Sequence, residues 1–330
     1  MFNIEQHWYR ITPLHLILFP VSLVFRLLVG ARHALYRNGI LRSRKLSKPV
    51  VVIGNINIGG TGKTPLTLAL VQQLIARGLH PLIISRGYGG SAKLPQHVIA
   101  NSTTQQVGDE PLLMARRGLC PVWVGRDRAA TAQLAMRNHP QCDVVVCDDG
   151  LQHYRLQRDV EIVVVDAQRG LGNGWLLPAG PLREPPSRLQ TVDAVVMNGK
   201  NAPAGQYLMQ LSGANFHNLL NPAQTAQPAD FQSTRNHAVA GIGNPQRYFD
   251  HLKTLDIKFI SHAFPDHHTY IAGDLSFADC DAILLTEKDA VKCTAFADEK
   301  FWVLRVDAQI PPALIDLITR KLSQYGRKTA

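Results

Sequence analysis

A lysine and a threonine at the end of a glycine-rich run are the residues of this chain best placed to do chemistry. Lys63 and Thr64 follow the segment 59–62 (Gly-Gly-Thr-Gly), whose glycines let successive backbone N–H groups curl around the phosphates of a nucleotide. Lys63 supplies an ammonium for the β- and γ-phosphates, and Thr64 supplies a hydroxyl for Mg²⁺. The sequence therefore predicts a site for ATP or GTP. The alternative is an ordinary glycine-rich turn with a solvated lysine.

The elements on either side must hold this loop in place. An apolar run over 51–53 predicts a buried strand before it, and apolar residues at helical spacing over 66–74 predict a helix after it, with the positive N-terminus toward the phosphates. The full pattern has a glycine where this chain has Asn57, but asparagine tolerates a left-handed backbone. The residues expected to bind the nucleotide are Asn57, Ile58, Gly59, Gly60, Thr61, Gly62, Lys63, Thr64 and Pro65.

Two carboxylates follow another apolar run. Residues 144–146 are three valines that predict a buried strand, and this strand delivers Asp148 and Asp149 at its carboxyl end, where ligands gather in open α/β sheets. In a phosphate-loop enzyme an Asp at this point holds Mg²⁺ directly or through water. Neighbouring residues of a strand point to opposite faces, so we expect only one of the two to reach the metal. A strand end with two solvated acids is the alternative.

Other loops carry polar residues whose role the sequence leaves open. The segment 85–90 follows a strand and either binds a phosphate or sugar or forms a turn. Asp109 has the pattern of a helix N-cap, and Arg183 lies in a proline-braced loop. In the second half of the chain, Asp266 and His267 belong to a row of potential ligands that cannot all converge on one metal ion. We expect Asp266 to orient His267, and the alternative is an exposed loop histidine.

Length and composition limit the possible classes of protein. The chain has 330 residues, 45% of them hydrophobic, which suffices for about two domains with sizeable cores. Its net charge of +10 is concentrated in residues 1–50, which hold eight Lys or Arg against one acid. This local excess indicates an anionic partner at one place and argues against a protein that coats nucleic acid. The five cysteines have no metal-ligand spacing and an odd count, as is typical of reduced thiols in the cytosol.

The basic N-terminal segment also contains an apolar stretch. A membrane-spanning helix needs about 20 uninterrupted apolar residues, and residues 14–28 are interrupted by His15, Pro20, Ser22 and Arg26. A secretory signal is disfavoured because export would separate the phosphate loop from its nucleotide. We expect instead a helix that lies in the membrane interface, with Trp8 and Tyr9 at headgroup depth. The alternative is a helix packed on the domain itself.

Apolar runs and helical patterns alternate along the rest of the chain. The β-branched runs indicate a parallel sheet covered by helices on both faces. We therefore expect an α/β fold of the P-loop NTPase type, with a mostly parallel sheet sandwiched by helices and a second, smaller α/β domain. The polar segment 220–233 is expected to be a linker. The predicted divisions are 1–48 for the membrane-associating segment, 49–225 for the phosphate-loop core and 234–330 for the C-terminal domain.

The order of these motifs resembles that of the tetraacyldisaccharide 4'-kinase family, the lipid A 4'-kinases of Gram-negative bacteria. The resemblance covers most of the chain, and the family also lacks the first glycine of the loop. The motifs that carry it are Gly54-Asn55, Gly59–Thr64, Ser85–Gly89, Gly108–Pro111, Asp148–His153, Leu177–Pro185, Asp266-His267 and Thr286–Asp289.

The resemblance implies an activity and its setting. The γ-phosphate of ATP would pass to the 4'-hydroxyl of an acylated glucosamine disaccharide 1-phosphate, which yields lipid IVA at the cytoplasmic face of the inner membrane. ATP and Mg²⁺ are the implied cofactors, and an anionic membrane surface is the implied partner. Neither a nucleic acid nor a protein partner is implied.

The resemblance also implies roles for single residues. Asp109 resembles the catalytic base and His267 its assistant, so activity would require the two domains to close over ATP. The implied catalytic residues are Asp109, His267, Lys63 and Asp149. The implied metal ligands are Thr64 together with Asp148 or Asp149. The implied substrate-binding residues are Ser85, Arg86, Tyr88 and Arg183.

Two other classes of protein share part of this pattern. One is a soluble phosphate-loop kinase or ligase that acts on a small metabolite. The other is a membrane-surface partitioning ATPase, whose loop also contains Gly-Gly-Thr-Gly-Lys-Thr. That class has a signature lysine directly before the glycine pair, where this chain has Ile58. The sequence therefore favours the lipid kinase over the partitioning ATPase.

Overall fold

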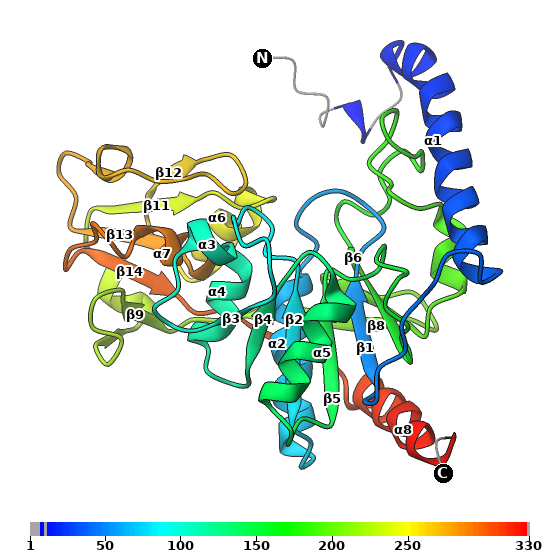
Figure 1. Ribbon diagram of the computed structural model, residues 1–330. Helices are drawn as coiled ribbons and strands as arrows, with labels where there is room; N and C mark the ends of the chain where they lie inside the picture. The colour runs from blue at the N-terminus through cyan, green and yellow to red at the C-terminus, as the bar shows by residue number, and fades with distance from the viewer. Residues whose placement is uncertain (1–6, 10–11, 329–330) are drawn as a thin grey trace.

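The computed structural model describes residues 7–9 and 12–328, which form two α/β bodies preceded by a long helix (Figure 1). The first body is built on a nine-stranded sheet and the second body on a six-stranded sheet. The α-helices are α1 (Leu14–Arg37), α2 (Lys63–Ala76), α3 (Thr104–Val107), α4 (Asp109–Arg116), α5 (Arg128–Asn138), α6 (Pro245–Thr254), α7 (Glu287–Cys293) and α8 (Pro312–Lys328). Short 3₁₀ helices lie at η2 (Pro186–Gln190), η3 (Pro228–Phe231) and η4 (Ala272–Leu275).

The first sheet is parallel except at its two edges. Its strands lie in the order β15 (Asp307–Gln309), β8 (Tyr207–Ser212), β7 (Ala194–Asn198), β6 (Val160–Asp166), β1 (Val50–Gly54), β5 (Val144–Asp148), β2 (Pro81–Ser85), β4 (Val122–Val124) and β3 (Gln96–Val98). The edge strands β15 and β3 run antiparallel to their neighbours. Because β1 lies between β5 and β6, the carboxyl ends of these strands meet where the phosphate loop begins.

Alternate residues of the central strand face two separate hydrophobic cores. Val51 and Ile53 pack with residues of α2, α4 and α8, whereas Val50 and Val52 pack with alanines of α5. A strand that is covered on both faces has to be apolar throughout, which is why β1 and its neighbours read as continuous β-branched runs. This arrangement confirms the predicted P-loop type of α/β fold, with the sheet between layers of helices.

The second sheet is smaller and is also covered on both faces. Its strands lie in the order β10 (Thr225–Ala226), β9 (Phe216–Asn218), β14 (Phe301–Leu304), β13 (Ala282–Thr286), β11 (Asn236–Ala240) and β12 (Ile260–Ala263). Phe249 and Leu252 of α6 pack on one face, and Ala290 and Cys293 of α7 pack on the other. In Figure 1 this body occupies the left of the view, with α3 and α4 of the first body beside it.

The chain divides between the two bodies at other places than the sequence pattern predicts. Residues 307–328, expected in a domain of 234–330, return to the first body, where β15 pairs with β8 and α8 adds Leu314 and Ile318 to the core. β15 has three residues, which are too few to show the hydrophobic periodicity from which this return could be predicted. The second body is therefore an insertion between β8 and β15.

The expected linker also differs from the structure. Residues 216–225, expected in a core of 49–225, belong instead to the second body, where β9 and β10 are part of its sheet. The segment 220–233 contains β10 and η3, so it is an ordered part of the second body. Its polar composition reflects an edge hairpin, which exposes much of its surface to solvent. The division into two domains remains a proposal, with these altered boundaries.

Helix α1 packs on the first body through two buried polar residues and through the rings of Phe19 and Phe25. His15 and Ser22 are the buried residues of this helix. Ser22 Oγ donates to the carbonyl oxygen of Leu176 and accepts from the backbone N–H of Ala179, both over 2.9 Å. His15 Nε2 lies 3.2 Å from Asn173 Nδ2. His15 and Ser22, two of the four residues that interrupt the apolar stretch, thus bind the loop before Arg183, and most of the apolar residues are exposed.

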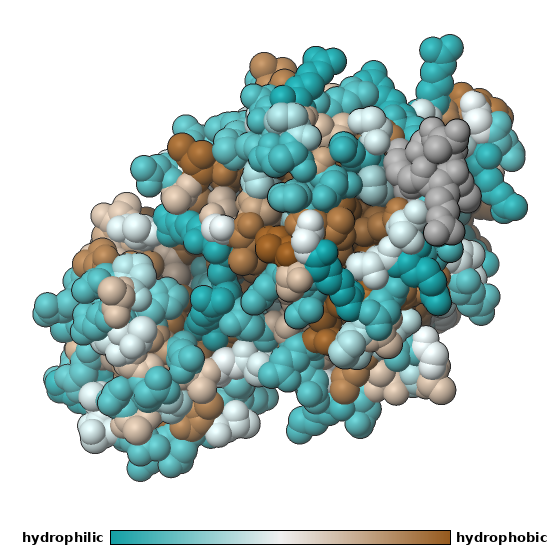
Figure 2. Space-filling model, turned by 90° about the horizontal axis from the view of Figure 1, so that it is seen from below, coloured by the Kyte–Doolittle hydropathy of each residue, from teal (hydrophilic) through white to brown (hydrophobic). Residues whose placement is uncertain are grey.

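The outward side of α1 holds much of the exposed hydrophobic surface of the described residues. Its exposed large hydrophobic residues are Leu16, Ile17, Phe19, Val21, Leu23, Val24, Leu27, Leu28 and Leu35. Leu14–Arg37 is long and apolar enough to cross a membrane, although its polar interruptions led us to expect otherwise. This test uses length and composition alone, and a signal sequence or a buried core helix would also pass it. Residues 1–6 and 10–11 of the expected membrane-associating segment lie outside the described residues. Seen from below, the surface is mostly hydrophilic, with hydrophobic residues near the middle of the view (Figure 2).

Candidate active site

The phosphate loop joins β1 to α2. The chain leaves β1 at Gly54 and enters α2 at Lys63, with Gly62 as the N-cap at φ 96°. A glycine is needed there because the backbone is left-handed and a Cβ would collide with the side-chain amide of Asn198. That amide donates to the carbonyl oxygen of Thr61 over 2.9 Å. The positive N-terminus of α2 therefore lies at the end of the loop, where it favours the binding of a phosphate.

The backbone of Asn57 is not left-handed. Among the described residues, the non-glycine residues with positive φ lie elsewhere, so the tolerance of asparagine for a left-handed backbone is not used at Asn57. Asn57 instead forms an antiparallel bridge with Leu182, and the backbone N–H of Ile58 donates to the carbonyl oxygen of Pro181 over 2.8 Å. The proline-braced loop thus supports the extended first half of the phosphate loop. An extended position tolerates a side chain, which explains why no glycine is needed.

Two carboxylates lie next to the start of α2. Lys63 Nζ is 3.5 Å from Asp149 Oδ1, and Asp149 follows β5 with φ 47°, so the two acids are not successive strand residues on opposite faces as expected. Asp148 is fully buried, and its Oδ1 accepts a hydrogen bond from Thr67 Oγ1 over 2.9 Å. Burial, and then the charges of Glu110 and Asp149, raise the pKa of Asp148 to about 7. A cation near Asp148 would favour its ionised form.

Several buried polar atoms around the loop have no hydrogen-bond partner among the described residues. They are Asn55 Oδ1, Asn57 Oδ1, Thr61 Oγ1 and Asp148 Oδ2. An unpaired buried polar atom costs about 1–3 kcal/mol, so a cluster of them is typical of a site that a ligand completes. Within the described part of the chain, no group of three or more His, Cys, Asp or Glu side chains could hold a metal ion by itself. Mg²⁺ commonly takes one or two carboxylates and fills its shell with phosphate oxygens and water, which these residues fit.

Helix α4 begins at Asp109 but is not capped by it. Gly108 is the N-cap, and Asp109 is the first helical residue, with its Oδ1 accepting from the backbone N–H of Glu110 over 2.9 Å. The expectation that Asp109 caps this helix is therefore wrong. Gly108 has φ 87° and ψ 159°, and a Cβ on it would collide with the carbonyl oxygen of Tyr88. The loop that carries Tyr88 is thus packed directly against the start of α4.

We expect Gly108→Ala to lower the free energy of unfolding by about 1–3 kcal/mol, because its backbone region is almost exclusive to glycine. Urea denaturation measures this loss. Gly118→Ala is the matched control, because Gly118 also has positive φ, at 66°, but a Cβ there would have no neighbour within 4 Å. Equal losses in the two variants would contradict a special requirement for glycine at position 108.

His267 of the second body meets Asp109 of the first. Its Nδ1 lies 2.9 Å from Asp109 Oδ2 and 3.2 Å from Oδ1. The expected partner, Asp266, accepts from the backbone N–H of His267 over 3.0 Å, and its Oδ2 stays 3.8 Å from Nε2. His267 also has φ 61°, a conformation that is uncommon for residues other than glycine. The backbone is therefore held by Asp266, and the imidazole by Asp109.

The contact between Asp109 and His267 shifts the pKa values of both side chains. Burial opposes ionisation of Asp109, but the hydrogen bond with His267 and the charge of Lys288 hold the pKa of Asp109 below its usual value. The hydrogen bond with Asp109 raises the pKa of His267, although burial and Lys288 act in the opposite direction. Near neutral pH the arrangement thus favours an ionised Asp109 that can accept a proton.

Of the residues expected to bind substrate, Ser85 is buried at the end of β2, whereas Arg86 and Tyr88 are exposed. Arg86 and Tyr88 line a cavity of about 270 Å³ together with Arg126. The ring of Tyr88 lies 5.0 Å from that of His267. The structure therefore brings Tyr88 beside His267, with Arg86 in the adjoining cavity, and it leaves the side chain of Ser85 buried.

Arg183 lies on the other side of the phosphate loop. Its Nη1 is 3.8 Å from Asp149 Oδ1, and its backbone N–H donates to the carbonyl oxygen of Ile56 over 2.6 Å. Against the effect of burial, Lys63 and then Arg183 hold the pKa of Asp149 below its usual value. Asp149 is thus the more readily ionised of the two neighbouring carboxylates.

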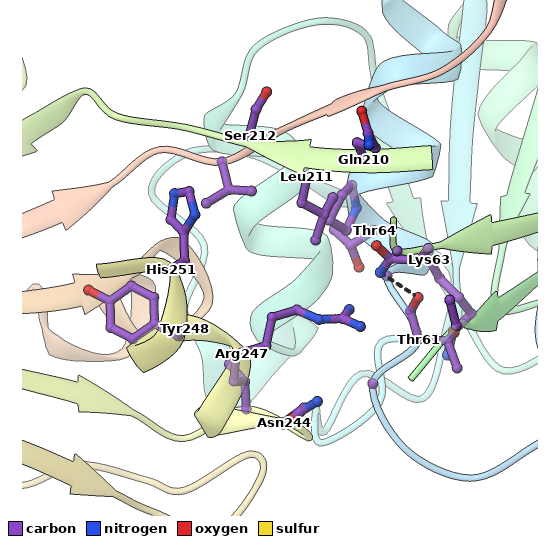
Figure 3. Close-up of a pocket in the computed structure, with 18 of the residues that line it drawn as sticks. Thr61, Lys63, Thr64, Gln210, Leu211, Ser212, Asn244, Arg247, Tyr248 and His251 are labelled. Carbon is purple, nitrogen blue, oxygen red and sulfur yellow. Dashed lines mark hydrogen bonds between the residues drawn. The ribbon is translucent and has the colours of Figure 1, made fainter. Parts of the chain in front are cut away.

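A cavity of about 1180 Å³ lies between the two bodies, next to the phosphate loop. The loop and α2 line it from the first body, and α6 lines it from the second. Figure 3 shows Arg247 extending from α6 toward Thr61 and Lys63, with Asn244 at the start of the helix. A cavity of this size accommodates a nucleotide.

Two cations beside this cavity are missed by sequence reasoning. Arg247 Nη2 lies 2.7 Å from Oδ2 of Asp166, a fully buried residue at the end of β6. The sequence pattern of α6 does not predict this contact. Lys288 Nζ lies 3.0 Å from Glu110 Oε1. Lys288 belongs to the motif Thr286–Asp289, which carries part of the family resemblance, and that motif was the available signal.

A parallel sheet whose central strand leads through a Gly-Gly-Thr-Gly-Lys-Thr loop into a helix, with an Asp at the end of the neighbouring strand, defines a P-loop nucleotide-binding protein. The family model described as tetraacyldisaccharide-1-P 4'-kinase matches residues 14–323. The chain belongs to this family, which confirms the resemblance drawn from its motifs.

Relatives of similar length support this assignment. The tetraacyldisaccharide 4'-kinase of Methylobacillus flagellatus is 48% identical over 325 residues, which cover 98% of this chain and 97% of the relative. The tetraacyldisaccharide 4'-kinase of Azoarcus sp. strain BH72 is 48% identical over 331 residues, which cover 98% and 96%. A crystal structure of LpxK from Aquifex aeolicus in complex with ATP is 27% identical, covers 94% of this chain and 99% of its own, and superimposes with a TM-score of 0.78.

Proposed function

We propose that this protein transfers the γ-phosphate of ATP to the 4'-hydroxyl of a tetraacylated glucosamine disaccharide 1-phosphate, which forms lipid IVA. The observation that carries the proposal is the Asp109–His267 pair, which joins the two bodies beside a cavity that the phosphate loop lines. Membership of the tetraacyldisaccharide 4'-kinase family gives the class of acceptor.

In this mechanism Asp109 accepts the proton of the sugar hydroxyl as its oxygen forms a bond to the γ-phosphorus. The bond from that phosphorus to the bridging oxygen breaks, and ADP leaves. Lys63 and the backbone N–H groups of the loop bind the phosphates and stabilise the charge that shifts during transfer. His267 keeps Asp109 ionised and oriented. Tyr88, which lies beside His267, and Arg86, which lines the same small cavity as Tyr88, are proposed to contact the disaccharide, and Arg183 its 1-phosphate.

Mg²⁺ belongs to the proposal and would neutralise charge on the phosphates of ATP. Thr64 and one of the two neighbouring carboxylates would hold it. Asp148 has one oxygen bound to Thr67 and the other without a hydrogen-bond partner among the described residues. Asp149 lies against the ammonium of Lys63. These contacts favour Asp148 as the ligand, directly or through water.

An anionic membrane surface is the proposed location, at the cytoplasmic face of the inner membrane. The support is the outward apolar side of α1 and three exposed arginines, of which Arg32 and Arg37 lie in the last turns of the helix and Arg42 lies just after it. A substrate with four acyl chains resides in a bilayer, so its kinase has to reach the membrane surface. A soluble kinase of a small metabolite would have no use for such a helix, and Ile58 argues against a partitioning ATPase.

Product analysis tests the proposal. The full-length protein is incubated with ATP, Mg²⁺ and the acylated disaccharide 1-phosphate in mixed micelles, and the lipid product is examined by mass spectrometry and NMR. We expect one added phosphate at the 4'-position. ATP hydrolysis without a phosphorylated lipid would favour an ATPase, and phosphorylation of water-soluble sugars alone would favour a metabolite kinase.

Reversing the charge of Arg32, Arg37 and Arg42 should release the protein from anionic vesicles, because each basic residue near such a surface contributes about 1 kcal/mol. Vesicle sedimentation at low and high salt measures the bound fraction. The matched control reverses Lys253, Lys258 and Lys300, which are exposed on the second body and change the net charge equally. Binding that responds equally to both triplets would mean that net charge, and not α1, drives the attachment.

A further inference from the structure

Lys288 lies where the two bodies meet, and the proposed function has given it no role. It belongs to the first turn of α7, which Thr286 caps by accepting from the backbone N–H of Asp289 over 3.1 Å. Its side chain is only 16% exposed. Across from it lies the first turn of α4, which carries Asp109 and Glu110. A lysine this buried needs acidic partners, since an unpaired ammonium would lose its hydration without compensation.

The ammonium of Lys288 contacts groups from two segments, one in each body. Its Nζ lies 3.0 Å from Glu110 Oε1 on α4 and 3.1 Å from Asp266 Oδ1 on the loop before η4. It also lies 4.0 Å from Asp109 Oδ2 and 3.5 Å from His267 Nε2. Three carboxylates and the imidazole therefore surround one cation. Burial lowers the pKa of Lys288, but these carboxylates outweigh it and raise that pKa, so the ammonium stays charged.

We propose that Lys288 is a positioning residue for phosphoryl transfer, which holds Asp109 and His267 in one ionic cluster when the two bodies meet. This inference rests on the proposed function. Without Lys288, Asp109, Glu110 and Asp266 would bring three negative charges together, and their repulsion would weaken both the contact and the ionisation of Asp109. The cation thus permits a carboxylate base to remain ionised in a crowded acidic site.

A purely mechanical role as a clamp explains the arrangement less well. Arg117 already joins the same two helices, because its Nη2 lies 2.7 Å from Glu287 Oε2 on α7. Arg247 and Asp166 form another ion pair between the bodies. Neither of these pairs contacts Asp109 or His267 in any recorded hydrogen bond or ion pair of the described residues. Lys288 is distinguished by its place beside both members of the pair.

The predicted signature is a shift of the whole pH profile of kcat. Removing a cation raises the pKa of a neighbouring carboxylic acid and also that of a neighbouring histidine. The groups that act on Asp109 are His267, Lys288 and the more distant Lys292, and those that act on His267 are Asp109, Asp266 and Lys288. Loss of Lys288 should therefore move both limbs of the profile to higher pH, by about one unit for a charge at this distance.

The experiment compares Lys288→Gln, Lys288→Arg and the matched control Arg117→Gln in the full-length protein. We expect Lys288→Gln to move both limbs upward by about one unit and to lower kcat on the acid side about tenfold, with little change in KM for ATP. Lys288→Arg should restore both limbs, since it restores the charge. Arg117→Gln should leave the limbs in place, whatever it does to thermal stability.

Each outcome decides the proposal. Unchanged limbs in Lys288→Gln, or an equal shift in Arg117→Gln, would overturn it. If Lys288→Gln does not fold, the double variant Lys288→Gln with Glu110→Gln is made instead, because it also removes one of the acids that would be left unbalanced. If this double variant folds and loses kcat but keeps the pH limbs of the wild type, that result would also count against a role of Lys288 through its charge. Wild-type enzyme that forms no 4'-phosphorylated lipid would refute the proposed function itself, which is a separate result.

Discussion

Asp109→Ala should lower kcat by roughly 10²–10⁴ with little change in the affinity for ATP, the range expected for loss of a general base. A sugar hydroxyl is a poor nucleophile until its proton has an acceptor, and Asp109 is a buried carboxylate held 2.9 Å from His267. Single-turnover kinetics with saturating ATP measures the chemical step. Asp109→Asn keeps the shape of the side chain and should lose a similar factor.

His267→Ala should add little to the loss in Asp109→Ala, because residues that act as one unit are not additive. A double-mutant cycle on kcat tests this coupling. His268→Ala is the matched control, because His268 lies next in the chain but binds Asp274 over 3.0 Å. Fully multiplicative losses for Asp109 and His267 would mean that the two residues act separately, and an active Asp109→Ala enzyme would remove the base from the mechanism.

Lys63→Ala should lower kcat by about 10²–10³, as does the loss of a preorganised electrostatic donor elsewhere. Lys63 starts α2 at the phosphate loop and lines the cavity between the bodies. Its neighbour Asp149, at 3.5 Å, holds the ammonium beside the site. Rapid-quench measurement of phosphoryl transfer reports the effect on the chemical step.

A second lysine separates this effect from a general change of charge. Lys253 lies on α6 at the surface and pairs only weakly with Asp250, at 3.4 Å. Lys253→Ala should therefore retain wild-type turnover. Near-normal turnover in Lys63→Ala, confirmed by active-site titration, would contradict the assignment of the nucleotide site.

The phosphate loop and the sheet could be predicted because their signals are local. Val51 and Ile53 belong to a run that is apolar on both faces, and such a run indicates a strand buried between two layers of helices. The glycines of the loop and Lys63 have a spacing that follows from phosphate geometry. The carboxylates after β5 come from the same reasoning, since the ends of neighbouring parallel strands meet at one edge.

The arrangement of the two bodies could not be predicted, because it depends on contacts between distant segments. β15 has three residues, and its pairing with β8 leaves no periodicity in the chain. The conformation of Asn57 depends on a bridge to Leu182, more than a hundred residues away. Asp109 has the local pattern of a cap, but the helix starts one residue earlier, with Gly108 as its N-cap packed against the carbonyl oxygen of Tyr88.

The central role of Lys288 is invisible for the same reason. A lysine in the first turn of a helix is usually solvated, and its sequence neighbours give no sign that α4 lies opposite. Its partners Glu110 and Asp266 are separated from it by 178 and 22 positions. A family motif without an assigned chemistry was the only hint, and the three-dimensional contacts were needed to interpret it.

The insertion of the second body between β8 and β15 has a consequence for biosynthesis. The chain passes to the second body near Gly213 and returns near Arg305, and these two crossings touch, since Arg305 N–H donates to the carbonyl oxygen of Asn215 over 3.2 Å. During translation the phosphate-loop body therefore emerges first but lacks Leu314 and Ile318 of its core until the last segment leaves the ribosome. The inserted body has all its strands by Leu304, so it can finish folding earlier. The body that holds the nucleotide loop is thus begun first and completed last.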